Sequence, residues 1–262
     1  MIYQERDRSI NLINTRKKHI VYGGGLGIML LDDVYPGFPG DVRNPSAYPF
    51  PIQYDVVENI DIRKLVYNED KSECREPIIK AAKRLERLGC RAIAAECGYF
   101  AYFQKDVVKE VSIPVFMSSL LQVPFMQQII DPDKKVGIFC FEKRCLADEH
   151  LVNAGITLGG RYVIGGAADQ YGCEEFANLW NYEVRAEKPL AYYDKAEREI
   201  VEGVTAFVKD NPDIGGILLE CTGMQPFGRA IQRAVELPVC DWGTLLDYAY
   251  AIVNHRDYYG HV

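Results

Sequence analysis

The sequence lacks several features that would assign a function class at once. No run of apolar residues among its 262 positions is long enough to span a bilayer. Lys and Arg (30) are outnumbered by Asp and Glu (37), and the net charge of −7 argues against a general nucleic-acid or anionic-membrane surface. The charged first 18 residues contain no apolar signal-peptide core. We therefore expect a cytoplasmic protein with neither a membrane nor a nucleic-acid partner.

Patterns for disulfides, metals and nucleotides are also missing. Eight cysteines are too few for a disulfide scaffold in a chain of this length, and no CxxC pair occurs. Cys140, Cys145 and His150 do not supply four ligands at zinc-site spacing, so we expect no metal. The glycine-rich residues 23–27 precede a strand instead of following one, and fit neither phosphate-binding pattern. Small-molecule chemistry is the class that these absences favour.

What the sequence does contain is one segment in two copies, each built around a cysteine. The first copy reads Ala-Glu-Cys-Gly at residues 95–98, and the second reads Leu-Glu-Cys-Thr at residues 219–222. In both copies a proline follows 17 residues after the cysteine, Pro114 in one and Pro238 in the other. A short apolar stretch precedes each cysteine, and apolar residues at helical spacing follow it. Each copy is predicted to be a strand, a cysteine, a helix and a second strand.

A cysteine between a strand and a helix lies beside unpaired backbone N–H groups and the positive end of the helix dipole. Both features favour the thiolate, and the same N–H groups can hold a substrate carboxylate. Two such junctions that face each other would place Cys97 and Cys221 on opposite sides of one carbon atom. The duplication therefore indicates proton transfer on two faces of a substrate.

Strands alternate with helices along the chain, which indicates an α/β protein. Strands are expected at residues 26–31, 92–95, 115–117, 136–141 and 217–219, and helices at residues 76–88, 100–110, 144–153, 194–208, 226–235 and 243–253. We predict two pseudo-symmetric halves, each a doubly wound parallel sheet of Rossmann type, with the active site in the cleft between them. The first half comprises residues 1–121 with 241–262 and carries Cys97, and the second comprises residues 122–240 and carries Cys221.

Two irregular segments have candidate roles at the site. Residues 35–51 directly follow the first strand and hold five of the thirteen prolines, so this stiff loop is a candidate wall or lid. Its polar tip, Arg43 and Asn44, is a candidate for substrate contact, and a rigid surface connection is the alternative. Residues 166–189, which include Trp180, are expected to be an insertion that covers the second half.

Paired cysteine junctions in two αβ halves without cofactor motifs resemble the aspartate/glutamate racemase superfamily, which includes hydantoin racemase, maleate isomerase and arylmalonate decarboxylase. Residues 26–31 and 39–51 are similar to its less characterised members, and the resemblance extends from about residue 26 to about residue 253. It implies that Cys97 and Cys221 are the catalytic pair. It also implies that the following residues contact substrate: Gly98, Tyr99, Thr222 and Gly223, with Ser118 and Ser119 at positions where such contacts are common.

The sequence departs from the superfamily at the first junction. Many racemases have Cys-Asn-Thr where this chain has Cys97, Gly98 and Tyr99, so a substrate-binding Asn is missing and the substrate class stays open. For Ser118 and Ser119, capping of a helix N-terminus is the alternative role.

The resemblance implies a cofactor-independent racemase or epimerase, an isomerase acting on an acidic amino acid, a related carboxylate or a hydantoin. One cysteine, as the thiolate, removes the α-proton, and the other returns a proton to the opposite face. The alternatives are another cofactor-free member of the superfamily, such as a maleate-type cis–trans isomerase or a decarboxylase, and a small-ligand-binding protein without catalysis. The partner expected is a small carboxylate substrate, and the family suggests a homodimer.

Overall fold

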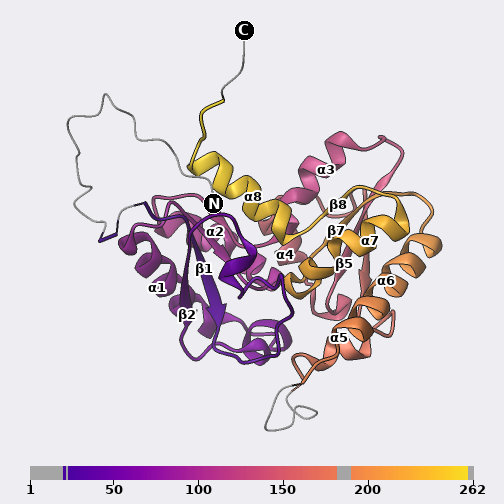
Figure 1. Ribbon diagram of the computed structural model, residues 1–262, viewed down its shortest axis with the longest axis horizontal. Coiled ribbons are helices and arrows are strands. Elements are labelled where there is room, and N and C mark those ends of the chain that lie inside the picture. The colour runs from indigo at the N-terminus through magenta and orange to yellow at the C-terminus, as the bar shows by residue number, and fades with distance from the viewer. Residues whose placement is uncertain (1–19, 22, 182–189, 259–262) are drawn as a thin grey trace.

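The computed structural model describes residues 20–21, 23–181 and 190–258, and it contains two parallel sheets side by side (Figure 1). The strands lie in the order β2-β1-β3-β4 in the first sheet and β6-β5-β7-β8 in the second. All neighbouring strands are parallel. Because the second order repeats the first, the predicted α/β fold with two pseudo-symmetric halves is confirmed.

The elements have the following bounds. The strands are β1 (Leu26–Leu31), β2 (Ile52–Val57), β3 (Ala92–Ala95), β4 (Val115–Phe116), β5 (Lys135–Cys140), β6 (Tyr162–Gly166), β7 (Ile214–Leu219) and β8 (Val239–Cys240). The α-helices are α1 (Ser72–Leu88), α2 (Gln104–Glu110), α3 (Val123–Ile129), α4 (Asp148–Asn153), α5 (Glu174–Asn178), α6 (Tyr193–Asp210), α7 (Gly228–Val235) and α8 (Trp242–Val253). Short helical turns are η1 (Pro45–Ala47), η2 (Arg63–Tyr67), η3 (Gly98–Phe103), η4 (Ser119–Gln122), η5 (Lys143–Cys145) and η6 (Thr222–Phe227).

The central strands match the sequence prediction, and the edge strands explain what it missed. β1 and β3 begin and end where their apolar runs do. The sequence pattern did not identify β2 or β6, which form the outer edges of the two sheets. β2 has only half-buried and exposed positions before its last residue, the buried Val57, and β6 ends in two glycines. Edge strands are half covered, so they lack the continuous apolar run that marks a buried parallel strand.

Helix α8 packs against the first sheet although it follows the last strand of the second. Leu26 and Ile28 on one face of β1 belong to the cluster that contains Trp242 of α8, whereas Met29 and Leu31 face the main core. This alternation is the period of two that a strand imposes on its side chains. The predicted domain limits remain a prediction.

One hydrophobic core runs through both halves. Buried residues of the first sheet, such as Ile93, share a contact cluster with buried residues of the second, such as Phe139. The carboxyl ends of β3 and β7 therefore meet inside one packed body. Within the described residues, no helix combines the length and the apolar character needed to cross a membrane.

Candidate active site

The two cysteines stand at the carboxyl ends of β3 and β7, at the point in each sheet where the chain switches from adding strands on one side to adding them on the other. Cys97 follows β3, which pairs with β1, and Cys221 follows β7, which pairs with β5. The next strand along the chain from β1, and from β5, lies on the other side, so both cysteines are at topological switch points. Crevices for ligands form at such points in open α/β sheets.

Both junctions open with a 3₁₀ turn before the α-helix begins, which the sequence did not predict. The N–H of Phe100 donates to the carbonyl of Cys97 at 3.0 Å, and the N–H of Met224 donates to that of Cys221 at 3.0 Å. These bonds span three residues, as in a 3₁₀ helix. The tighter turn points the backbone N–H of the second residue after each cysteine, Tyr99 or Gly223, at the sulfur.

Cys97 and Cys221 line the same cavity between the halves. The cavity holds about 30 Å³, roughly the share of one water molecule in the liquid. Its walls come from both halves and are mostly apolar: Leu31, Tyr35, Ile62, Val66, Glu96, Cys97, Tyr99, Phe141, Trp180, Cys221 and Thr222. The two thiols that the sequence predicted as a pair are thus brought together.

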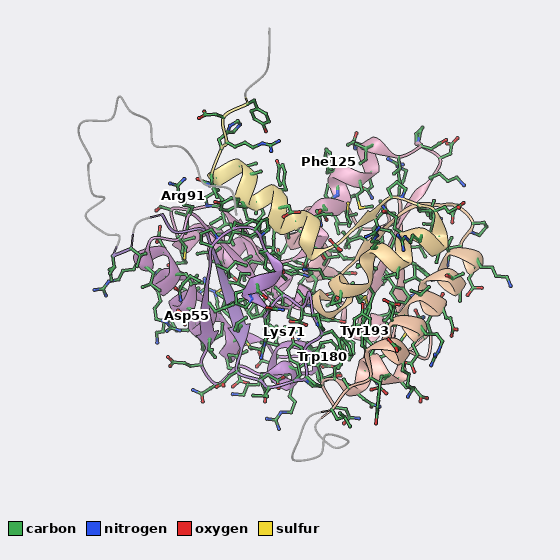
Figure 2. The ribbon with its side chains drawn as sticks, in the orientation of Figure 1. Asp55, Lys71, Arg91, Phe125, Trp180 and Tyr193 are labelled. Atoms are coloured by element: carbon green, nitrogen blue, oxygen red, sulfur yellow. The ribbon has the colours of Figure 1, made fainter. Side chains whose placement is uncertain are left out.

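Aromatic rings form much of the wall. The ring of Trp180 lies 5.2 Å from that of Tyr35 and 5.4 Å from that of Phe141, measured between centroids. Trp180 lies where the two halves meet (Figure 2). It packs so closely on Gly223 that a Cβ there would come within 2.6 Å of the indole, so the second junction requires glycine. Residues 182–189 of the expected insertion lie outside the described residues, but its described part supplies α5 and this tryptophan.

The pKa of each thiol is raised well above its ordinary value. Burial is the main cause at both Cys97 and Cys221, and the charge of Glu220 adds to it. The backbone N–H groups of Tyr99 and Gly223 act in the opposite direction. The expectation that the junctions favour the thiolate is therefore wrong in this structure, because desolvation outweighs a single N–H group at each sulfur.

Each cysteine is preceded by a buried glutamate, and sequence analysis assigned no role to either. The N–H of Glu96 donates to the carbonyl of Met29, and the N–H of Glu220 to that of Phe139, both at 2.9 Å. Their side chains accept hydrogen bonds two residues further along, from the N–H of Leu31 at the end of β1 at 2.8 Å and from that of Phe141 directly after β5 at 3.4 Å. The signal was present in the sequence, since Glu stands before Cys in both copies.

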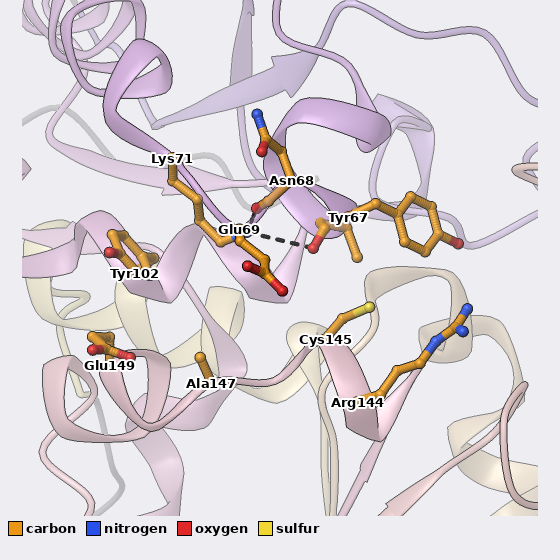
Figure 3. A pocket seen from close by; sticks show the side chains of 10 residues that line it. Tyr67, Asn68, Glu69, Lys71, Tyr102, Arg144, Cys145, Ala147 and Glu149 are labelled. Carbon is orange, nitrogen blue, oxygen red and sulfur yellow. Dashed lines mark hydrogen bonds between the residues drawn. The ribbon is translucent and has the colours of Figure 1, made fainter.

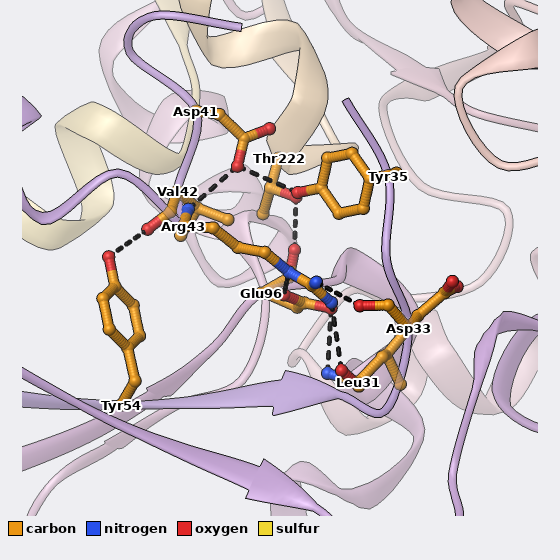
Figure 4. A network of polar contacts seen from close by, with 9 residues as sticks. All are labelled: Leu31, Asp33, Tyr35, Asp41, Val42, Arg43, Tyr54, Glu96 and Thr222. Atoms are coloured by element: carbon orange, nitrogen blue, oxygen red, sulfur yellow. Dashed lines mark hydrogen bonds and ion pairs between the residues drawn. The ribbon is translucent and has the colours of Figure 1, made fainter. Parts of the chain in front are cut away.

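Glu96 forms an ion pair with Arg43 from the proline-rich loop (Figure 4). The guanidinium also donates to the carbonyls of Leu31 and Asp33, and it lies over the ring of Tyr35, with its carbon 4.7 Å from the ring centroid. Burial alone would lower the pKa of Arg43, but the hydrogen bonds and charge of Glu96 raise it. Arg43 therefore stays charged, and its guanidinium binds groups of the protein instead of being available to a ligand in the cavity.

The proline-rich loop joins both halves. Asp41 accepts hydrogen bonds from the hydroxyl of Tyr35 and the N–H of Arg43, both at 2.8 Å. Gln225 of the second half donates to the carbonyl of Gly40 at 2.9 Å. Through Tyr35 this loop supplies a wall of the cavity, the role that the sequence predicted as one of two.

Several other predicted contact residues lie outside the cavity lining. Asn44 caps η1, and Ser118 caps η4 by accepting from the N–H of Leu120. Ser119 donates to the carbonyl of Leu219 at 2.8 Å. Asn44 and Ser118 thus occupy capping positions, and their role in substrate binding remains a prediction.

Thr222, Tyr99 and Gly98 join the two junctions. The hydroxyl of Thr222 donates to the carbonyl of Glu96, and that of Tyr99 donates to the carbonyl of Glu142 at 2.7 Å. A Cβ on Gly98 would collide with the carboxyl group of Glu220, so only glycine fits there. Each half therefore closes the junction of the other.

A larger cavity of about 610 Å³ opens next to the cysteine cavity and shares Val66 with it (Figure 3). Lys71, Tyr102, Arg144 and Glu149 are among its lining residues. The ammonium group of Lys71 donates to the carbonyls of Leu65 at 2.8 Å and of Asn68 at 2.7 Å, so it closes the end of η2. This polar space is the candidate approach to the inner cavity.

Comparison with solved structures shows which known folds this one is similar to. No protein-family model matches the chain. Among solved structures, it is similar to allantoin racemase from Klebsiella pneumoniae, with a TM-score of 0.58 and 12% identity, covering 88% of this chain and 87% of that one. It is also similar to an aspartate racemase homologue from Pyrococcus horikoshii OT3 (TM-score 0.53, 20% identity, 88% and 100% covered) and to arylmalonate decarboxylase (0.53, 12%, 87% and 93%). The resemblance to the aspartate/glutamate racemase superfamily is confirmed for the fold.

Sequence comparison identifies nearer relatives. A dimethylsulfoniopropionate lyase from Durusdinium sp. clade D is 31% identical over 221 residues, which cover 82% of this chain and 70% of that protein. Dimethylsulfoniopropionate lyase 3 of Emiliania huxleyi (strain CCMP1516) is 30% identical over 220 residues, covering 82% of this chain and 56% of that protein. The chain thus spans little more than half the length of the Emiliania protein.

These relatives correct the function expected from the sequence. The residues predict a racemase or epimerase, an isomerase, whereas the relatives are named lyases. The cysteine junctions indicate removal of a proton beside a carboxylate, a step with which both racemisation and elimination can begin. The outcome depends on what else the substrate carries, which the repeat does not encode. With 31% identity over 82% of its length, the chain belongs to the dimethylsulfoniopropionate lyase family.

Proposed function

We propose that this protein is itself a lyase that cleaves dimethylsulfoniopropionate into dimethyl sulfide and acrylate. The observation that carries the proposal is the pair of thiols, Cys97 and Cys221, in one cavity walled by aromatic rings. The relatives' names supply the substrate, and the site supplies groups suited to it.

The reaction is a β-elimination that needs one base. A cysteine thiolate takes a proton from the carbon next to the carboxylate, the electron pair forms the carbon–carbon double bond of acrylate, and the carbon–sulfur bond breaks. The sulfur leaves with that bonding pair as neutral dimethyl sulfide. The proton ends on the cysteine and passes to solvent before the next turnover. The second cysteine is not required to return a proton to carbon.

The aromatic wall suits a dimethylsulfonium cation. Its methyl groups are apolar while the sulfur carries a positive charge, a combination that aromatic rings bind through cation–π interactions. Tyr35, Phe141 and Trp180 present such rings beside the thiols. The cation also favours a thiolate near it, which offsets the effect of burial on the thiol pKa. The cavity of about 30 Å³ must widen to admit the substrate.

The substrate carboxylate is assigned to the backbone N–H groups that open η3 and η6, at Gly98 and Thr222. N–H groups at the start of a helical turn are suited to negative charge, and the charge on the carboxylate side grows as the α-proton leaves. Arg43 is not assigned this role, because Glu96 and two carbonyls occupy its guanidinium.

Incubating the purified chain with dimethylsulfoniopropionate tests the proposal. Dimethyl sulfide is measured in the headspace by gas chromatography and acrylate in solution by proton NMR. We expect both products in equal amounts, and none above background from a variant with Cys97→Ala and Cys221→Ala together. Product formation by the double variant at the wild-type rate, or none by the wild-type chain, would refute the assignment.

A further inference from the structure

Glu220 differs from Glu96 in one respect that bears on the cysteines. Both carboxyl groups accept a backbone N–H, from Leu31 at the end of β1 and from Phe141 directly after β5. Glu96 also has the guanidinium of Arg43 as its counter-ion. Glu220 forms no ion pair with any described residue, and its Oε1 atom is buried without a hydrogen-bond partner there.

The surroundings of Glu220 hold it against the first junction. Its side chain has no exposed surface. Its backbone carbonyl accepts from the indole N–H of Trp242 at 3.0 Å and from the hydroxyl of Ser119 at 3.3 Å, so helix α8 and turn η4 both anchor the residue. The carboxyl group packs on the Cα of Gly98, directly after Cys97.

The titratable groups around this carboxyl are neutral hydroxyls and thiols. Cys97 and Tyr99 face it from the first junction, Cys140 from β5, and Cys221 from its own turn. The hydroxyl of Tyr99 is bonded to the carbonyl of Glu142, and the thiol of Cys140 lies 3.4 Å from the carbonyl of Gly165. A carboxylate in these surroundings would be a buried charge without compensation, which is strongly unfavourable.

We propose that Glu220 is a positioning residue that acts as an uncharged carboxylic acid, so that a cysteine sulfur carries the negative charge that no cation of the protein balances, whereas the charge of Glu96 is balanced by Arg43. The inference rests on the proposed function for its catalytic consequence, but its effect on the thiols stands by itself. Glu220 is absent from the cavity lining and acts through its neighbours Cys97 and Cys221.

The neutral state has a limited pH range. Burial raises the pKa of Glu220 to about 8, and the N–H of Phe141 only partly opposes this. Below that pH the acid is neutral and adds no charge to the site. Above it the carboxylate forms and raises the pKa of both cysteines, as its charge does in the structure. The thiolate fraction therefore rises less with pH than it would beside a group that cannot ionise.

The test measures thiolate content directly. Wild-type protein and Glu220→Gln are alkylated with iodoacetamide from about pH 6.5 to about pH 10, and the rates at Cys97 and Cys221 are resolved by peptide mass spectrometry. At about pH 9 we expect at least one of the two to react roughly tenfold faster in Glu220→Gln, which corresponds to one pKa unit. Near pH 6.5 both proteins should react at similar rates, because the acid is neutral in each.

Two further variants keep the outcome clear. Glu175→Gln changes another buried glutamate, 45 residues before Glu220. It should leave the alkylation profiles of Cys97 and Cys221 at wild-type values. Glu220→Asp retains an ionisable group, so alkylation of its cysteines at high pH should stay as slow as in the wild type. This variant tests the inference even if Glu220→Gln folds poorly. Identical profiles for wild type and folded Glu220→Gln, or slower alkylation of the variant at high pH, would overturn the inference.

Activity supplies an independent reading. If dimethyl sulfide is released, Glu220→Gln should match the wild-type rate near neutral pH and exceed it above about pH 8. Inactivity of folded Glu220→Gln at every pH would mean that the acid transfers a proton, and it would overturn the positioning role. If no dimethyl sulfide forms but the alkylation profiles separate as expected, the proposed function fails and the role of Glu220 stands.

Discussion

The two halves of the molecule share a backbone plan and differ in their electrostatics. Strand order, cysteine position and the glutamate before each cysteine are the same in both. Only Glu96 of this pair has a cation, supplied by Arg43 from a loop that precedes it in the chain. A reaction that takes one proton from one carbon needs a single base, so unequal halves suit an elimination better than equal ones. The duplicated frame is thus the same in both halves, while the local charges differ.

The aromatic walls of the cavity also differ between the two halves. The first half contributes Tyr35 and Tyr99, and the second contributes Phe141 and Trp180. Each pair comes from irregular segments or junctions rather than from the repeated strands. The chemistry at the bottom of the cavity is thus duplicated, and the surface that would select a substrate is not.

Replacing the cysteines one at a time should have the largest effect. If one thiolate is the base, Cys97→Ala and Cys221→Ala will lose dimethyl sulfide release unequally, and the more affected variant will lose roughly 10²- to 10⁴-fold in kcat. Cys90→Ala, at a buried cysteine outside the cavity, is the matched control and should keep a near-normal rate. Equal and complete loss in both single variants would contradict the single-base mechanism.

Removing the counter-ion of Glu96 should be the next largest effect, and it should concern stability. Arg43→Met leaves a carboxyl group with only 4% of its side chain exposed and no cation, which costs about 3–5 kcal/mol in other proteins. We expect a loss of that order in the free energy of unfolding by urea. The double variant with Glu96→Gln should recover part of it, and Glu220→Gln alone should change it little. Similar losses in the free energy of unfolding for Arg43→Met and Glu220→Gln would contradict the difference between the two glutamates.

Acid should destabilise the fold through His150. Its ring lies between Tyr99 and Tyr102 of the first half, with centroids 5.5 and 5.4 Å away, and burial lowers its pKa to about 4. The unfolded chain binds this proton near pH 6.5. The contribution of neutral His150 to the free energy of unfolding is therefore complete above about pH 6.5. It is lost as the pH falls toward about 4, by roughly 3 kcal/mol.

His150→Leu tests this contact. The variant should lose less stability than wild type between about pH 7 and about pH 4, as measured by urea unfolding at each pH. Parallel losses in the two proteins would show that other groups govern the acid limb.

The aromatic wall should give the smallest effect. Trp180→Leu keeps an apolar side chain but removes a ring, so it should weaken binding of the sulfonium substrate by about tenfold, within the range of a desolvated cation–π contact. The matched probe is 4-methylpentanoate, which has a neutral CH in place of the sulfonium sulfur. Inhibition constants should show that the variant loses discrimination between the charged and neutral compounds. A variant that weakens both equally would assign Trp180 to packing alone.

The parallel α/β frame and the pair of cysteines could be predicted from the residues alone. Buried strands need continuous apolar runs, and a repeat of 17 residues from cysteine to proline places the two junctions at equivalent points of two sheets. Local pattern also located the loop that carries Tyr35 and Arg43. These features depend on neighbours in sequence, so they can be read without the fold.

The electrostatics of the site follow from the three-dimensional packing. That Arg43 neutralises Glu96, that Glu220 has no such partner and that burial raises the pKa of both thiols all depend on groups far apart in the chain. Desolvation and ion pairing act through space, so no spacing of residues along the sequence predicts them.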